Sequence, residues 1–87
     1  MLISRAEPFL HHIVAEVERR GLPGELALLP AVESGFRTYA YSRSGAAGLW
    51  QFMPATGRIY GLTVTRRIDE RLDPERSTHA ALRHLGD

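Results

Sequence analysis

Three polar residues, Glu33, Ser42 and Gln51, follow one another at intervals of nine positions in the middle of the sequence. Glu33 closes the apolar run 26–32, and a segment that is apolar on every face is normally buried. We therefore expect its carboxyl group to leave the core at an edge, where partial burial and the negative end of a helix both favour the protonated form. A carboxyl group that keeps its proton near neutral pH can act as a general acid, which makes Glu33 the candidate catalytic residue.

The residues that follow Glu33 suit a polar, uncharged ligand such as a carbohydrate. A serine hydroxyl and a glutamine amide each offer a donor and an acceptor, which sugar hydroxyl and N-acetyl groups require. The small residues 45–48 would let the backbone approach a ligand closely, and Met53, beside two aromatic residues, could contact a sugar face. A plainer interpretation also stays open: a solvated carboxylate at a helix end, a turn serine, a surface amide and ordinary core side chains.

The spacing of apolar residues predicts a mainly α-helical chain, with no strand pattern of useful length. A first helix is expected over about residues 5–20, with Pro8 in its first turn and a stop at Gly21. Pro30 cannot donate a hydrogen bond to the carbonyl group of Leu26, so a second helix over 25–34 should contain a kink or a tightened turn. The remaining elements are an irregular connection over 35–48, a helix over 48–60 that can break at Pro54, a loop over 62–73, and a last helix capped by Asp73.

Length and composition exclude several classes of protein. The 87 residues form at most one small domain, spanning 1–87. Cysteine is absent and the four histidines stand apart from other ligand residues, so we expect no metal and no cofactor. A formal net charge of +1 offers no basic surface for nucleic acid. The apolar start 1–3 is far too short for a signal peptide, and no apolar run approaches the roughly 20 residues of a membrane span.

The sequence motifs around these residues resemble those of a known family. The resemblance rests on ESGF from Glu33, on Ser42, and on GAAGLWQFMPATG over 45–57. Together these motifs are similar to the soluble-lytic-transglycosylase domain of the lysozyme-like superfamily. The flanking words ELALLP over 25–30 and YGL over 60–62 look most like the membrane-bound lytic murein transglycosylase D group. The similarity covers about residues 9–85, and several separated motifs in register make it specific.

This resemblance implies that Glu33 is the catalytic acid and base, and that Ser42, Gln51 and Met53 line the sugar-binding cleft. It implies an enzyme of the bacterial cell envelope or periplasm that cleaves the β-1,4 bond between N-acetylmuramic acid and N-acetylglucosamine in peptidoglycan, with formation of a 1,6-anhydro ring. One carboxylate is enough for this chemistry, because the sugar's own 6-hydroxyl is the nucleophile. We therefore expect no second catalytic carboxylate in the charged, exposed stretch 66–76.

The resemblance also implies an incomplete domain, because family members continue past the helix that matches 74–85. We expect the N-terminal part of a goose-type, lysozyme-like helical domain without its C-terminal helices, weak activity or none from this chain alone, and self-association through uncovered apolar faces. Three alternatives stay open: a goose-type lysozyme that hydrolyses the same bond, a non-catalytic helical module that binds glycan or acts as a scaffold, and, more remotely, a helix-turn-helix DNA-binding protein, for which the second helix lacks a basic face.

Overall fold

The computed structural model describes residues 2–87, with side chains from Ala6 onward, and over these residues the chain is mainly helical. Contacts between extended segments are limited in this range to three isolated bridge pairs. The elements in chain order are α1 (Leu2–Arg19), the short 3-10 helix η1 (Gly24–Leu28), α2 (Leu29–Ser34), α3 (Pro54–Ile59), the 3-10 helix η2 (Glu70–Leu72) and α4 (Pro74–Gly86). The predicted fold class, mainly α, is confirmed.

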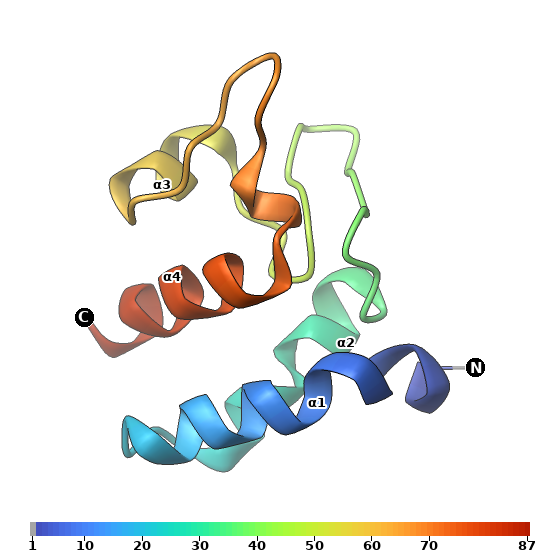
Figure 1. Ribbon diagram of the computed structural model, residues 1–87, viewed down its shortest axis with the longest axis vertical. Coiled ribbons are helices and arrows are strands. Elements are labelled where there is room, and N and C mark those ends of the chain that lie inside the picture. Colours follow the sequence, from blue (N-terminus) through green and yellow to red (C-terminus); the bar gives the residue numbers. More distant parts are fainter. Residues whose placement is uncertain (1) are drawn as a thin grey trace.

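Helices α1 and α4 lie side by side and form the base of the molecule, with α2 next to α1 and α3 on the other side of α4 (Figure 1). The core lies between these helices and the connection that carries the central motif. Its fully buried side chains include Ile13 and Val17 from α1, Leu49 from the connection, and Leu82 from α4. The connections before and after α3 therefore rest on a helical base that fixes their position.

Helix α1 begins three residues before the predicted start, so Pro8 lies inside the helix rather than in its first turn. Its end is as predicted. Gly21 takes the left-handed conformation at φ +66°, its N–H donates to the carbonyl of Glu18, and the N–H of Leu22 donates to that of Val17. This pair of bonds closes a helix C-terminus where only glycine is free of strain.

The second predicted helix is two pieces, η1 and α2, and Pro30 explains the division. Pro30 has no N–H for the carbonyl of Leu26, so the chain forms a tight 3-10 helix first and restarts as an α-helix with Pro30 in its first turn, as the sequence indicated. The expectation that this apolar segment is buried all round is wrong. Leu28 and Val32 are 58% and 82% exposed, while Ala27 and Pro30 face the core.

The predicted helix over 48–60 is also wrong in its first half, because α3 begins only at Pro54. Residues 47 and 52 pair as an antiparallel bridge around a turn in which Gly48 and Gln51 have φ values of +84° and +52°. An α-helix cannot include left-handed residues, and the residue before a proline is held in an extended conformation. The left-handed Gly48 and the extended Met53 before Pro54 therefore restrict the helix to residues 54–59.

Helix α4 begins as predicted, with Asp73 as its cap and Pro74 at its first position. The Asp73 carboxylate accepts a hydrogen bond of 2.9 Å from the N–H of Arg76. The predicted loop over 62–73 is confirmed apart from the single turn η2. No helix within residues 2–87 has the length and apolar character needed to cross a membrane.

Candidate active site

Glu33 lies in the last turn of α2, and its side chain is exposed rather than partly buried as expected. Its neighbour Ser34 is buried instead. Glu33 nevertheless faces a cavity, because it lines an open groove of about 320 Å³ together with Leu29, one turn earlier on the same helix. The carboxyl group therefore combines contact with water and access to a ligand-sized hollow.

The groove is built from three parts of the chain that are far apart in sequence. Helix α2 supplies one part, residues 50–53 with the adjoining start of α3 the second, and α4 the third. The residues that line it are Leu29, Glu33, Trp50, Gln51, Phe52, Met53, Thr56, Ala81, His84 and Leu85. Three of the four site residues predicted from the sequence, Glu33, Gln51 and Met53, are thus brought together at one surface.

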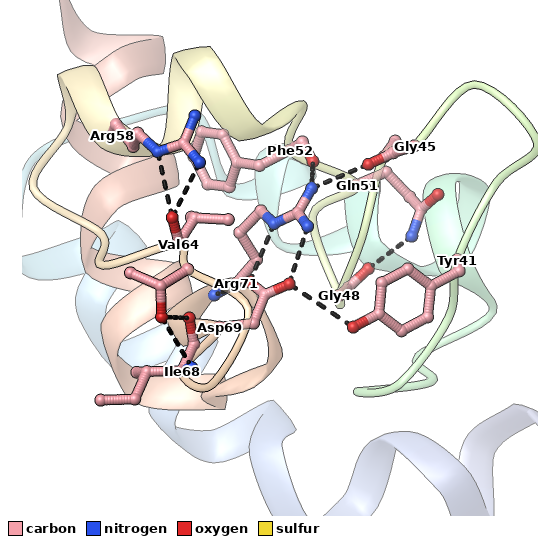
Figure 2. Close-up of polar contacts among 12 residues, drawn as sticks. Tyr41, Gly45, Gly48, Gln51, Phe52, Arg58, Val64, Ile68, Asp69 and Arg71 are labelled. Carbon is pink, nitrogen blue, oxygen red and sulfur yellow. Dashed lines mark hydrogen bonds and ion pairs between the residues drawn. The ribbon is translucent and has the colours of Figure 1, made fainter.

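Gln51 lines this groove, and its side-chain amide is held in a fixed orientation. Its amide nitrogen donates to the carbonyl oxygens of Ala40 and Gly48, at 3.0 and 2.9 Å, which fixes the orientation of the amide. Figure 2 shows the bond to Gly48. Both N–H donors of the side chain are used in these bonds, so its oxygen is the atom left for a ligand. Gln51 can therefore accept a hydrogen bond from a sugar hydroxyl or N-acetyl N–H group.

Met53 and Trp50 supply the apolar part of the groove in different ways. Met53 is 42% exposed and open to a ligand. Trp50 is largely buried, and its indole N–H donates to the hydroxyl of Thr78 at 3.0 Å, which ties the turn to α4. Trp50 thus contributes an edge to the groove while its main role is to hold the turn on the base.

Ser42 is the predicted site residue that the structure does not bring into the groove. Its hydroxyl lies 3.0 Å from that of Ser44 and accepts a 2.9 Å hydrogen bond from the N–H of Ala46. These contacts brace an exposed loop tip. A role for Ser42 in sugar binding stays a prediction.

Ser34 is a site residue that the sequence did not single out. Its buried hydroxyl lies 2.9 Å from the carbonyl oxygen of Pro30 and 2.8 Å from that of Leu49. It therefore joins the last turn of α2, which carries Glu33, to the segment that carries Gln51. The available signal was a small polar residue between the catalytic candidate and a glycine, which also fits an ordinary helix end.

The sequence predicts that the charged stretch 66–76 is exposed throughout. The structure differs at Arg71, which is only 5% exposed. Arg71 forms a bidentate ion pair with Asp69. Hydrogen bonds from the Arg71 guanidinium hold the pKa of the Asp69 carboxyl group below its usual range. Glu70 accepts a 2.7 Å bond from the N–H of Thr63, and Asp73 caps α4. None of these carboxylates lines the groove, so Glu33 is its one acidic side chain among the described residues.

Two of the four histidines, His79 and His84, make packing or polar contacts among the described residues. His84 lines the groove and lies 4.7 Å, between ring centroids, from Tyr60, which donates to the Asp87 carboxylate at 2.8 Å. The pKa of Tyr60 is raised, first by that hydrogen bond and then by burial. His79 contacts Arg20 at 2.7 Å. Among residues whose side chains are described, no three His, Asp or Glu groups gather as they would around a metal ion.

Fold and groove together define a mainly helical domain that offers one carboxyl group, one amide oxygen and an apolar surface to a ligand. Comparison with known proteins makes this class specific. Residues 12–87 match the model of the Transglycosylase SLT domain, so the chain belongs to that family. Its helical architecture fits the lysozyme-like fold of such domains.

Curated relatives agree with the family assignment. The chain is 53% identical over 78 residues to membrane-bound lytic murein transglycosylase D from Escherichia coli K12, a match that covers 90% of this chain and 17% of that protein. It is 47% identical over 85 residues to a putative tributyltin chloride resistance protein from Alteromonas sp. strain M-1, covering 98% of this chain and 41% of that protein. The chain therefore spans less than half the length of either relative.

Proposed function

We propose that this chain is part of a peptidoglycan lytic transglycosylase that cleaves the β-1,4 bond between N-acetylmuramic acid and N-acetylglucosamine and forms a 1,6-anhydro product. The observation that carries the proposal is that Glu33, Gln51 and Met53 line one groove in a chain of the transglycosylase SLT family. The 53% identity to a lytic murein transglycosylase supports murein as the substrate class.

Glu33 serves first as an acid and then as a base. In its protonated form it donates its hydrogen to the glycosidic oxygen, and the bond between that oxygen and the anomeric carbon breaks. The carboxylate left behind takes the proton of the sugar's 6-hydroxyl as this oxygen bonds to the anomeric carbon. The carboxyl group is thereby restored, and the internal hydroxyl replaces the water that a hydrolase would have to position.

The groove residues account for how a glycan would be held beside Glu33. The free side-chain oxygen of Gln51 accepts a hydrogen bond from a sugar hydroxyl or N-acetyl N–H, and the exposed part of Met53 packs on a sugar face or acetyl methyl group. Ser42 does not line the groove, and its contact with a more distant sugar of the glycan strand is part of this proposal. No cofactor is required for these steps.

Product masses separate this proposal from its two alternatives. Purified sacculi are incubated with the full gene product that contains this sequence, and the masses of the released muropeptides are measured by mass spectrometry. A lytic transglycosylase gives disaccharide products that lack one water molecule, a goose-type lysozyme gives the hydrated products with a reducing end, and a non-catalytic glycan-binding or scaffold module releases neither. Hydrated products, or intact sacculi, would contradict the proposal.

A cell-envelope or periplasmic location follows from the substrate, since murein lies there, and one relative is described as membrane-bound. Peptidoglycan strands are the expected partner. Self-association also stays a proposal, and the exposed Leu28 and Val32 on the outer side of η1 and α2 are the side chains that would support it. Sedimentation of the wild type and of Val32→Ser tests it, because a monomeric wild type would exclude it.

A further inference from the structure

The side chain of Arg71 makes four hydrogen bonds, although it does not line the groove. Its Nε and Nη2 atoms donate to the two oxygens of Asp69, at 2.9 and 2.7 Å. Its Nη1 atom donates to the backbone carbonyl oxygens of Gly45 and Phe52, at 2.8 and 2.9 Å. Figure 2 shows the guanidinium between the Asp69 carboxylate and these two carbonyl groups.

Gly45 and Phe52 enclose the segment that we call the groove turn, residues 45–52. Gln51 lies inside it, and Met53 follows it directly. Gln51 has a left-handed backbone at φ +52°, a conformation that costs a non-glycine residue about 1–3 kcal/mol and persists only where surrounding contacts impose it. The carbonyl bonds from Arg71 are made within one residue of Gln51 and at the opposite end of the turn, so they are suited to impose it.

Two glycines show that the groove turn and α3 are fitted closely to Arg71. A Cβ atom built on Gly48 would overlap the carbonyl oxygen of Arg71 and lie 2.8 Å from its carbonyl carbon. A Cβ atom on Gly57 of α3 would lie 3.4 Å from the Cγ atom of the Arg71 side chain. The backbone of the turn therefore rests on the backbone of residue 71 while its two ends are bound by the guanidinium.

The positive charge of Arg71 is neutralised by the neighbouring carboxylate of Asp69. Asp69 accepts two of its N–H groups, and the hydroxyl of Tyr41, in the segment before the turn, lies 3.4 Å from the same carboxylate. A planar guanidinium can serve a carboxylate and two carbonyl groups at once, whereas the ammonium of lysine cannot reproduce this geometry. The site thus requires arginine for its shape as well as for its charge.

We propose that Arg71 is a positioning residue for the groove: by holding both ends of the groove turn, it fixes the direction in which Gln51 presents its side-chain oxygen to the glycan. The inference rests on the proposed function for its consequence, weaker glycan binding. Its structural part, the ordering of the turn, stands independently. Arg71 touches no substrate, so the effect is on affinity and not on the proton transfers of Glu33.

Arg58 provides a matched control. It also holds a backbone carbonyl through two N–H groups, donating to Val64 at 3.1 and 2.8 Å, but that carbonyl belongs to the loop after α3 and not to the groove turn (Figure 2). Arg71→Lys and Arg58→Lys are therefore compared in the full chain. Amide hydrogen exchange reports on Ala47 and Phe52, whose N–H and carbonyl groups pair across the turn. Isothermal titration with a peptide-free tetrasaccharide of alternating N-acetylglucosamine and N-acetylmuramic acid, in a Glu33→Gln background that prevents turnover, reports on affinity.

We expect Arg71→Lys to lose exchange protection at these two amides and to raise the Kd of the tetrasaccharide about tenfold, which corresponds to one lost hydrogen bond. Arg58→Lys should change neither. With Glu33 intact, the KM of Arg71→Lys for glycan should rise while kcat is retained. Wild-type protection and affinity in Arg71→Lys, or equal losses in both variants, would overturn the proposal.

Two further outcomes are also decisive. If Arg71→Lys does not fold, Asp69→Asn weakens the two-pronged pair while leaving the guanidinium in place, and it should show the same losses at smaller size; full protection there would contradict the proposal. If the reference protein does not bind the tetrasaccharide, the proposed function fails, and the exchange comparison still decides whether Arg71 orders the groove turn.

Discussion

Replacement of Gly48 by alanine tests how closely the groove turn is seated on the segment after η2. The φ of Gly48 is +84°, and Gly61, after α3, has nearly the same φ of +89° but nothing within 4 Å of a Cβ atom. Gly61→Ala should therefore lower the free energy of unfolding only by the cost of a left-handed alanine backbone, about 1–2 kcal/mol. Gly48→Ala carries the same cost, and in addition its Cβ atom must displace the carbonyl of Arg71, which adds about 1–3 kcal/mol or more for overpacking.

The expected loss in the free energy of unfolding is thus about 2–5 kcal/mol for Gly48→Ala, out of about 4–13 kcal/mol for a domain of this length. Urea unfolding followed by tryptophan fluorescence measures it, since Trp50 lies in the same turn. The difference between the two variants isolates the steric contribution, because the backbone conformation is shared. Equal destabilisation by Gly48→Ala and Gly61→Ala would refute the close contact between the turn and residue 71.

Two other predictions follow from the contacts around the groove. Ser34→Ala removes the hydroxyl that donates to the carbonyl of Leu49 and should lower the free energy of unfolding by about 1–3 kcal/mol. Its control, Ser44→Ala at an exposed loop tip, should change this free energy by less than about 0.5 kcal/mol. Equal small effects of both variants in chemical denaturation would show that the bond between Ser34 and Leu49 does not stabilise the fold. The pKa of Asp69 is lowered chiefly by its hydrogen bonds from Arg71, so the stability of this pair is fully present above the unfolded value of about 3.9 and is lost as the pH falls through the lower folded value. The stability difference between wild type and Asp69→Asn should therefore shrink below about pH 4, and a difference that is constant from pH 2 to 7 in acid unfolding curves would contradict the ion pair.

The elements that the sequence predicted correctly are those governed by local rules. Gly21 closes the C-terminus of α1, α4 begins with its Asp73 cap, and Pro30 divides the second helical segment, because each depends on residues within one turn. The grouping of Glu33 with Gln51 and Met53 was also predicted, and it came from the family resemblance of the motifs.

The features that the sequence did not predict depend on contacts between distant residues. Residues 48–53 form a turn instead of a helix, and Arg71, some twenty positions away, binds the carbonyl of Phe52 and packs its own carbonyl against Gly48, a contact that no local pattern predicts. Arg71 itself stands among exposed arginines, and nothing in its neighbours distinguishes it from them. Glu33 is more exposed than expected because the groove is open on its side and the apolar run before it buries only one face.

The most direct test of the account is the rate at which Glu33→Gln releases anhydro-muropeptides from sacculi, in the full gene product that contains this sequence, compared with Glu25→Gln. Glu25 is an exposed acid in η1 that lies outside the groove, so its variant controls for the loss of one negative charge nearby. The account predicts that Glu33→Gln remains folded and loses at least about 10²-fold in rate, as expected for removal of a general acid and base, while Glu25→Gln retains wild-type turnover. Release of anhydro products at similar rates by wild type and Glu33→Gln would contradict it.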